Sequence, residues 1–249
     1  MAAEPLPSAQ QLIADAAALE VRLDGQQAAQ LVAFGQALLR WNRAFNLISR
    51  KDEDRLYHRH LLDSLSVLPA LADPARPSPA RRVLDVGSGP GLLGVPLAIA
   101  SPSSHFELID RNARRMRFVD QTARSLTLEN VTTRCGDVRA LAASVYDAVV
   151  MRAVVDAGDA WALAGHLVAP AGRMVIMASG QTPGGDTAGK ADVAAAQRVN
   201  GICAQRIPVR IPGLPVAHEI QILSRLGCEP GAAAPETGPA ESQPAEQGR

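Results

Sequence analysis

The 249-residue sequence predicts an α/β fold, in which helices cover both faces of a mostly parallel sheet, preceded by a helical N-terminal segment. From residue 82 onward, short apolar runs alternate with helical stretches, a rhythm typical of parallel sheets. Before residue 73, apolar residues recur at steps of three and four, the period of an amphipathic helix. A proline-rich stretch separates the two patterns. We therefore expect a helical segment at 1–75, an α/β domain at 76–228 and a disordered acidic tail at 229–249.

Two helices account for most of the N-terminal segment. Asp24 can cap the first by accepting a backbone N–H, and the second is expected to run from Asp52 to Pro69. The buried face of the first helix is expected to contain Leu31, Phe34, Leu38, Trp41 and Phe45. That of the second contains Tyr57, Leu61, Leu65 and Leu68.

The α/β domain is expected to contain a seven-stranded sheet. Parallel strands are expected at 82–86, 105–109, 131–135, 145–150 and 173–178, and helices at 91–100, 112–126 and 156–168. The apolar runs at 204–211 and 218–224 follow each other across a Pro-Gly-Leu-Pro turn, so they should close the sheet as an antiparallel hairpin. The loop at 179–190 has no periodic apolar residues and is expected to be mobile.

The charge balance, the cysteine spacing and the lack of long apolar runs argue against a strongly basic protein, a disulfide-rich or zinc-binding protein and a membrane protein. Lys+Arg and Asp+Glu both total 25, but the tail holds four glutamates and one arginine, which leaves 24 basic and 21 acidic residues in the rest of the chain. Cys135, Cys203 and Cys228 lie far apart, so we expect no disulfide framework and no metal site. Without a leader sequence or a long apolar run, a cytoplasmic location without a membrane partner is expected.

The most informative stretch is VLDVGSGPGLLG at 83–94. A strand that ends in Asp85 is followed by Gly87, Gly89 and Gly91, which let the chain turn sharply while a ligand approaches the backbone. A helix then begins with its free N–H groups, which favours a ligand cradle over an ordinary strand-to-helix turn.

The identity of the ligand follows from the glycine spacing and from a downstream acid. A dinucleotide fold requires GxGxxG, whereas this loop reads GxGxG, with Leu92 where the third glycine should be, so an NAD enzyme is poorly supported. Asp110 ends the next expected strand, where a carboxylate can accept both hydroxyls of a ribose. We therefore expect a nucleoside-like cofactor.

These features resemble the class I S-adenosylmethionine-dependent methyltransferases, whose sheet is Rossmann-like. The resemblance implies that the glycine loop lies against the methionine and ribose, that Asp110 binds the ribose, and that Asp137 and Val138 border the adenine. On residue chemistry alone, Asp137 would instead cap the turn before Arg139. The implied cofactor-binding set is Asp85, Gly87, Gly89, Gly91, Leu92, Asp110, Asp137, Val138, Arg139 and Arg152.

The sequence motifs that accompany several methyl-transfer chemistries are absent from this sequence. No cysteine follows a proline, as attack on cytosine C5 commonly requires, and no Asp/Asn-Pro-Pro-aromatic tetrad for exocyclic amines occurs. An atom that is already nucleophilic, such as guanine N7, needs no base, so catalysis would consist mainly of positioning and exclusion of water.

Four sequence stretches, which follow one another along the chain, indicate one family among these methyltransferases. They are WNRAFNLIS (41–49), RHLLDSL (59–65), LDVGSGPGLLGVPLAI (84–99) and the dipeptide Arg152-Ala153. They resemble the bacterial small-subunit ribosomal RNA guanine-N7 methyltransferase family, RsmG, also called glucose-inhibited division protein B. The family implies transfer of a methyl group from S-adenosyl-L-methionine to N7 of one guanine in the decoding-region loop of 16S ribosomal RNA. The implied partner is this RNA, within the small subunit or an assembly intermediate, and a monomeric enzyme is expected.

The family also implies a wall between the N-terminal helices and the reaction site. Arg152, His60, Asp63 and Asn46 are its candidates for positioning the substrate. From the residues alone, Arg59 and Asp63 would form an i,i+4 ion pair, His60 would be a packing histidine, and Arg152 a surface arginine.

RNA affinity depends on local rather than global charge. Arginines and one lysine cluster at positions 40–59 and again in RNARRMR (111–117), although a solvated helix face explains the second cluster equally well. The chain departs from the family at Ser179-Gly180, where Lys-Gly is usual, at Asp137, where arginine is common, and in a less basic stretch at 218–226. The alternatives are therefore a methyltransferase for a small metabolite and a catalytically silent module that binds a nucleoside cofactor or RNA.

Overall fold

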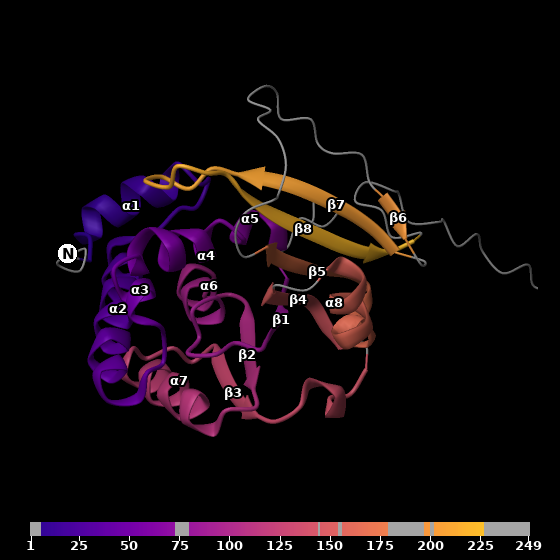
Figure 1. The fold of residues 1–249 in the computed structure, drawn as a ribbon, viewed down its shortest axis with the longest axis horizontal. Coiled ribbons are helices and arrows are strands. Elements are labelled where there is room, and N and C mark those ends of the chain that lie inside the picture. Colours follow the sequence, from indigo (N-terminus) through magenta and orange to yellow (C-terminus); the bar gives the residue numbers. More distant parts are fainter. Residues whose placement is uncertain are drawn as a thin grey trace, which may run out of the picture.

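The computed structural model describes residues 6–72, 80–143, 145–153, 156–178, 197–199 and 202–226. A central sheet lies between two layers: α2, α6 and α7 lie on one side of it and α8 on the other (Figure 1). Alternate strand residues enter two separate cores. Val83 of β1 joins the core beneath the N-terminal helices, whereas Leu84 joins the core beneath α8. This two-sided burial explains why the strands read as continuous apolar runs.

The sheet confirms the predicted α/β class. Its strands are β1 (Arg82–Val86), β2 (His105–Asp110), β3 (Val131–Cys135), β4 (Tyr146–Ala153), β5 (Val168–Ala178), β6 (Gln197–Val199), β7 (Ile202–Val209) and β8 (His218–Arg225). They lie in the order β3-β2-β1-β4-β5-β8-β7-β6. The first five are parallel, and β8 pairs antiparallel with both β5 and β7. All seven expected strands are therefore present, and the short β6 extends the antiparallel end.

The order of the strands determines where a site can form. The order of the strands reverses at β1: β2 and β3 follow on one side of it, and β4 and β5 follow on the other. Ligands of parallel sheets bind at such a reversal, outside the carboxyl ends of the strands. Val86, Asp110 and Ala153 end β1, β2 and β4, so these strand ends mark the place.

The N-terminal segment begins with α1 (Ala9–Ala17) and α2 (Gly25–Phe45). The predicted cap of α2 is confirmed, because Asp24 Oδ1 accepts the Gln27 N–H at 2.7 Å and Gln27 Oε1 accepts the Asp24 N–H at 2.9 Å. Trp41 and Phe34 pack against Phe118 of α7, with ring centroids 5.4 and 6.4 Å apart. The segment is thereby fixed against the sheet domain.

The second helix differs from the prediction, because the region is broken into α3 (Arg50–Glu53), the π-helix η1 (Leu56–Leu62), α4 (Asp63–Leu65) and α5 (Leu68–Leu71). Ser49 rather than Asp52 caps the start, since Ser49 Oγ accepts the Asp52 N–H at 3.2 Å. Further along, Ser64 Oγ donates to the His60 carbonyl at 2.6 Å, and hydroxyls that bond to carbonyls compete with the regular helix ladder. π-Turns of this kind concentrate at functional sites.

The helices of the α/β part are α6 (Gly94–Ala100), α7 (Ala113–Ser125) and α8 (Ala157–Ala164), with 3₁₀ turns η2 (Val138–Ala140) and η3 (Gly165–Leu167). α6 begins three residues later than expected because Gly87, Gly89 and Gly91 of the glycine loop have left-handed backbone conformations, which a helix cannot contain. α8 ends earlier than expected because Val168 already pairs with Tyr146 in the sheet.

Several predictions fall outside the described residues. These are the proline-rich stretch at 73–79, the loop at 179–190 with Ser179-Gly180, and the tail from 229. Within the described residues, no helix combines the length and apolar character needed to cross a membrane.

Candidate functional site

The glycine loop has the geometry that its sequence predicts. Gly87, Gly89 and Gly91 have φ values of +66°, +57° and +75°, which residues with a side chain rarely adopt. A Cβ at Gly91 would lie 2.7 Å from Val95, whereas Cβ atoms at Gly87 and Gly89 would point into open space. Gly91 is thus required for packing on α6 as well, and Gly87 and Gly89 leave room for a ligand beside the backbone.

Two carboxylates hold this loop in place. Asp110 Oδ2 accepts the Gly89 N–H at 2.9 Å, and Asp110 Oδ1 accepts the Asn112 N–H at 2.7 Å. Asp85 Oδ2 accepts the Gly94 N–H at 2.8 Å at the start of α6. The two acids predicted from the sequence therefore support the turn from opposite sides.

Asp85 is fully buried, and its environment makes it a weak acid. Burial raises the pKa of the Asp85 carboxyl to about 7, and the hydrogen bond from Gly94 and the positive charge of Arg152 only partly oppose this effect. The negative charge of Asp110 raises the pKa further. Asp85 therefore changes its protonation state near neutral pH.

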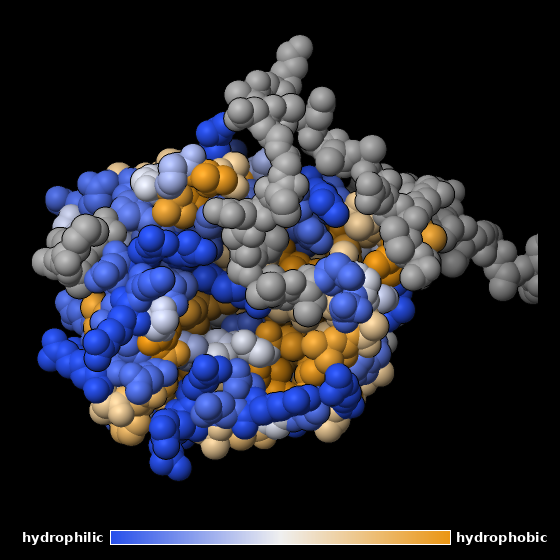
Figure 2. Space-filling view, viewed as in Figure 1, coloured by the Kyte–Doolittle hydropathy of each residue, from blue (hydrophilic) through white to orange (hydrophobic). Residues whose placement is uncertain are grey.

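A pocket of about 350 Å³ opens beside the loop, between the ends of β1, β2 and β3 and the helix α8. It is lined by Val86, Gly87, Ile109, Asp110, Arg111, Gly136, Val138, Arg139 and Leu163. Four of these, Gly87, Asp110, Val138 and Arg139, belong to the predicted cofactor-binding set. Figure 2 shows a hollow in the middle of this face, with hydrophobic surface towards α8 and hydrophilic surface towards α3 and α7.

Asp137 lies at the edge of this pocket and caps η2. Its Oδ1 accepts the Arg139 N–H at 3.0 Å, as the turn-capping interpretation predicts. Its Oδ2 pairs with Arg111 at 2.6 Å and lies 3.5 Å from Arg139. Asp137 thus orients two exposed arginines at the rim of the pocket.

A second cluster surrounds Arg152, near the end of β4. The guanidinium donates from Nη1 to His60 Nδ1 at 2.8 Å and to the Arg59 carbonyl at 3.3 Å, and from Nη2 to Ser64 Oγ at 3.0 Å. Its Nη2 lies 3.8 Å from Asp63 Oδ2. Its buried Nε has no hydrogen-bond partner in the described structure. The interpretation of Arg152 as a surface arginine is therefore wrong.

His60 is neutral in this cluster. An arginine can only donate, so His60 Nδ1 must accept and the ring proton lies on Nε2. Burial, reinforced by the positive charge of Arg152, lowers the pKa of His60 to about 4 despite the nearby Asp52. His60 Nε2 lies 3.3 Å from Asp52 Oδ1 but outside hydrogen-bonding geometry.

One expectation for this region needs correction, and one site candidate lies apart from the cluster. Asp63 does not pair with Arg59; it lies in the buried interior and contacts Arg152 and, at 2.8 Å, His218 Nδ1. The π-turn of η1 removes the regular i,i+4 alignment on which the Arg59 pair depended. Asn46 does not join the cluster, because it is exposed and ends α2 in a left-handed conformation with φ of 48°.

Two members of the cluster were not predicted from the sequence. Ser64 lies within the RHLLDSL stretch but carried no predicted role, although its hydroxyl also reaches the Leu92 carbonyl at 2.6 Å. His218 comes from the start of β8, 155 positions after Asp63. Only the antiparallel closure of the sheet brings it near.

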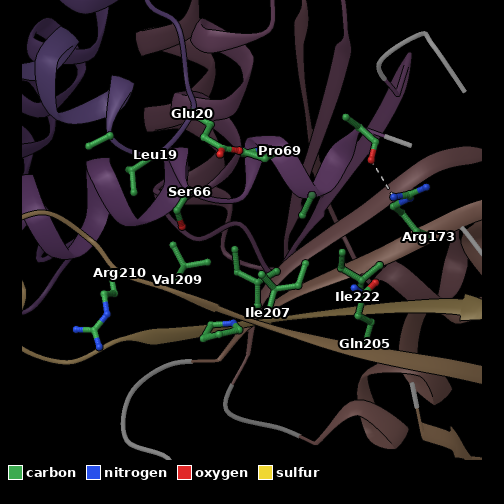
Figure 3. Close-up of a pocket in the computed structure, with 15 residues that line it drawn as sticks. Leu19, Glu20, Ser66, Pro69, Arg173, Gln205, Ile207, Val209, Arg210 and Ile222 are labelled. Atoms are coloured by element: carbon green, nitrogen blue, oxygen red, sulfur yellow. Dashed lines mark hydrogen bonds between the residues drawn. The ribbon is translucent and has the colours of Figure 1, made fainter. Parts of the chain in front are cut away.

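A separate cavity of about 530 Å³ lies between the N-terminal helices and the β7–β8 hairpin (Figure 3). Ile207, Val209 and Ile222 form its apolar floor, and Arg173 donates to the Ala72 carbonyl at 2.9 Å on one side. None of the predicted site residues lines it.

The architecture resembles that of a known methyltransferase. TomG from Streptomyces achromogenes, an O-methyltransferase involved in tomaymycin synthesis and solved in complex with SAM, aligns with a TM-score of 0.50 at 15% identity. The alignment covers 86% of this chain and 96% of TomG, and at this identity it supports the fold alone.

Sequence comparison identifies the family to which the chain belongs. The chain is 38% identical over 218 residues to the ribosomal RNA small subunit methyltransferase G of Ralstonia nicotianae, which covers 86% of this chain and 94% of the relative. It is also 38% identical to the Salmonella typhimurium protein of the same name, over 73% of this chain and 83% of the relative. The family model for GidB, rRNA small subunit methyltransferase G, matches residues 27–200. The chain therefore belongs to the GidB family of ribosomal RNA small subunit methyltransferases G.

Proposed function

We propose that this protein transfers a methyl group from S-adenosyl-L-methionine to N7 of a guanine in 16S ribosomal RNA. The observation that carries the proposal is the convergence of Gly87, Asp110 and Val138 on one pocket at the carboxyl edge of the parallel strands. The family relationship supports ribosomal RNA as the substrate.

The pocket fits a nucleoside-containing cofactor. When bound, the cofactor supplies an electrophilic methyl group on a positively charged sulfur. Asp110 lies beside Gly89, and each of its oxygens retains a lone pair that can accept a ribose hydroxyl. Val138 and Leu163 offer apolar contacts for a base, and Arg139 lies at the same rim. Asp137, which orients Arg139, belongs to this end of the proposed site.

The methionine part is assigned to the other end of the loop. Asp85 lies in β1, and Gly89, Gly91 and Leu92 lie along the turn between β1 and α6. Open space at Gly89 leaves the backbone accessible there. The positive charge of Arg152 stabilises the ionised form of Asp85, which connects this part of the loop with the second cluster.

The second cluster is assigned to the substrate. Guanine N7 attacks through an in-plane lone pair, so the protein has to align the base rather than remove a proton. The Arg152 side chain is 22% exposed, so its guanidinium can donate to an acceptor on the base, while His60 and Asp63 hold it in place. A neutral His60 adds no positive charge beside a base that becomes cationic on methylation.

A basic strip offers phosphate contacts beside the cofactor pocket. The end of α2 and the start of α7 lie side by side (Figure 1), and they carry exposed arginines that form no ion pair within the described part of the chain. These are Arg40, Arg43, Arg114 and Arg117. Arg114 lies 5.7 Å from the ring centre of the exposed Phe45. Arginine beside an aromatic ring suits an unstacked RNA loop.

The substrate is the 16S RNA within a small subunit or an assembly intermediate, because a chain with zero net charge depends on a shaped target more than on long-range attraction. The enzyme acts as a cytoplasmic monomer, and residues 1–75, 76–228 and 229–249 form its helical segment, catalytic domain and tail.

Methyl transfer to purified small subunits tests the proposal. Subunits from cells that lack this modification are incubated with the protein and S-adenosylmethionine carrying a labelled methyl group. The label should enter 16S RNA, and reverse-transcription mapping should place it at N7 of a single guanine. Transfer only to small molecules would favour a metabolite enzyme. Calorimetric binding of S-adenosylhomocysteine without any transfer would favour a silent module.

A further inference from the structure

We propose that His218 is a positioning residue of the reaction site, which sets the orientation of Arg152 through Asp63. The inference rests on the proposed function only in giving Arg152 a substrate to contact. Asp63 has a side chain that is 7% exposed, and its two oxygens contact different partners. Asp63 Oδ1 lies 2.8 Å from His218 Nδ1, and Asp63 Oδ2 lies 3.8 Å from Arg152 Nη2.

The chemistry of the pair defines the role of each atom. A carboxylate only accepts, so the proton of the short contact lies on His218 Nδ1. This hydrogen bond fixes the plane of the carboxylate, and the second oxygen is then directed to the guanidinium. His218 thus orients Asp63, and Asp63 in turn orients Arg152, as a third group does in a catalytic triad.

Arg152 depends on this orientation because its other contacts are uncharged. Its Nη atoms donate to neutral His60, to Ser64 Oγ and to a carbonyl, and its Nε has no partner in the described structure. Asp63 is the acid within ion-pair distance of the guanidinium. A rotated Asp63 carboxylate would leave the buried cation without that neighbour, which is costly in the protein interior.

His218 is itself held rigidly. It begins β8 and pairs with Val209 of β7, so its backbone belongs to the sheet. The hairpin loop is anchored a second time on the N-terminal segment, where His58 Nδ1 lies 2.9 Å from the Pro212 carbonyl oxygen. Gly213, with φ of +80°, permits this approach, because a Cβ there would lie 2.5 Å from the His58 ring. In Figure 1 the loop between β7 and β8 reaches over towards the N-terminal helices.

The test compares two replacements of His218. His218→Phe keeps a flat ring and removes the donor, whereas His218→Asn restores a side-chain N–H near the position of Nδ1. We expect kcat for methyl transfer to small subunits to fall about tenfold or more in the Phe variant and to recover in part in the Asn variant. The dissociation constant for S-adenosylhomocysteine should stay within about twofold in both, because His218 lies away from the cofactor pocket.

His105→Phe is the matched control. His105 begins β2, which is separated from β8 by β1, β4 and β5, and its Nε2 also makes one side-chain hydrogen bond, to Thr132 Oγ1 at 3.1 Å. Its kcat should equal that of the unmodified protein. An unchanged kcat in His218→Phe, or an equal loss in the Phe and Asn variants, would overturn the proposal, provided that thermal unfolding shows each variant to be folded.

A second readout separates this inference from the proposed function. In ¹⁵N-labelled protein the buried Nε–H of Arg152, assigned through Arg152→Lys, should give a sharp, slowly exchanging resonance. In His218→Phe the resonance should broaden or exchange faster, and in His218→Asn it should be retained. An unaltered Arg152 signal in the Phe variant would refute the positioning role even if no methyl transfer to RNA were found in any form of the protein.

Discussion

Asp110 accepts the Gly89 N–H through one carboxylate oxygen at 2.9 Å, so the acid expected to bind a ribose also fixes the glycine loop. Its other oxygen accepts the Asn112 N–H at the start of α7. The loop, the next helix and the proposed ribose site therefore depend on one side chain, and its replacement should disturb all three.

We expect Asp110→Asn to weaken binding of S-adenosylhomocysteine by about tenfold to a hundredfold, since hydrogen bonds to a charged group contribute about 1.5–3 kcal/mol. Isothermal titration calorimetry measures this change directly. Asp120→Asn on α7, which removes an exposed acid paired with Arg124, should leave the affinity within about twofold. Equal affinity of Asp110→Asn and the unmodified protein would exclude the ribose role.

The buried carboxyl of Asp85 should make stability depend on pH. Its pKa is raised from the usual 3.8 to about 7, so between these values the folded state binds more protons than the unfolded state. The contribution of Asp85 to the free energy of unfolding is therefore full below about pH 4 and is lost as pH rises through 7, by at most about 4 kcal/mol.

Asp85→Asn should remove this dependence while keeping an oxygen for the Gly94 N–H. Urea unfolding at pH 5 and at pH 8 should show the variant gaining stability relative to the unmodified protein as pH rises. A constant difference between the two proteins at both pH values would show that Asp85 has an ordinary pKa.

His60 should remain neutral across the physiological range, because its pKa is lowered to about 4. In NMR spectra its Cε1–H resonance, assigned through His60→Gln, should not shift between pH 5.5 and pH 8. Acidification should then cost stability as pH falls from about 6.5 towards 4, since the unfolded chain takes up this proton first. A midpoint near 6.5 would mean that the contact with Arg152 does not hold His60 in its neutral form.

Gly94 should tolerate no side chain. A Cβ there would lie 2.7 Å from Asp85 Oδ2 and 2.8 Å from Leu108 Cγ, both of them buried. Gly94→Ala should lower the free energy of unfolding by about 1–3 kcal/mol through overpacking and should weaken cofactor binding. Gly25→Ala, at the start of α2 where nothing lies within 4 Å, should leave stability equal or slightly higher. Chemical denaturation of both variants measures the contrast.

The sheet and the cofactor end of the site could be predicted because their signals are local. A strand, a glycine turn and a helix follow one another within residues 83–94, and Asp110 lies at the end of the next strand. Parallel topology then places these ends together without further information. The seven strands, the α/β class and the family were therefore predictable, and all are confirmed.

The substrate end could not be predicted in the same way. The spacing of apolar residues predicted one helix from Asp52 to Pro69. This spacing does not reveal serine hydroxyls that donate to backbone carbonyls within the helix, as that of Ser64 does to His60. The i,i+4 rule paired Arg59 with Asp63, whereas tertiary packing gave Asp63 a partner from the last strand. Contacts between residues so distant in the chain have no local signature.

The bond between Asp63 and His218 has a consequence for synthesis of the chain. Translation delivers Asp63 first, then the glycine loop, then Arg152, and β8 only near the end. A nascent chain that stops before β8 already contains every residue that lines the cofactor pocket but lacks the group that orients Asp63. The C-terminal hairpin therefore completes the substrate end of the site last, after every residue that lines the cofactor pocket has been made.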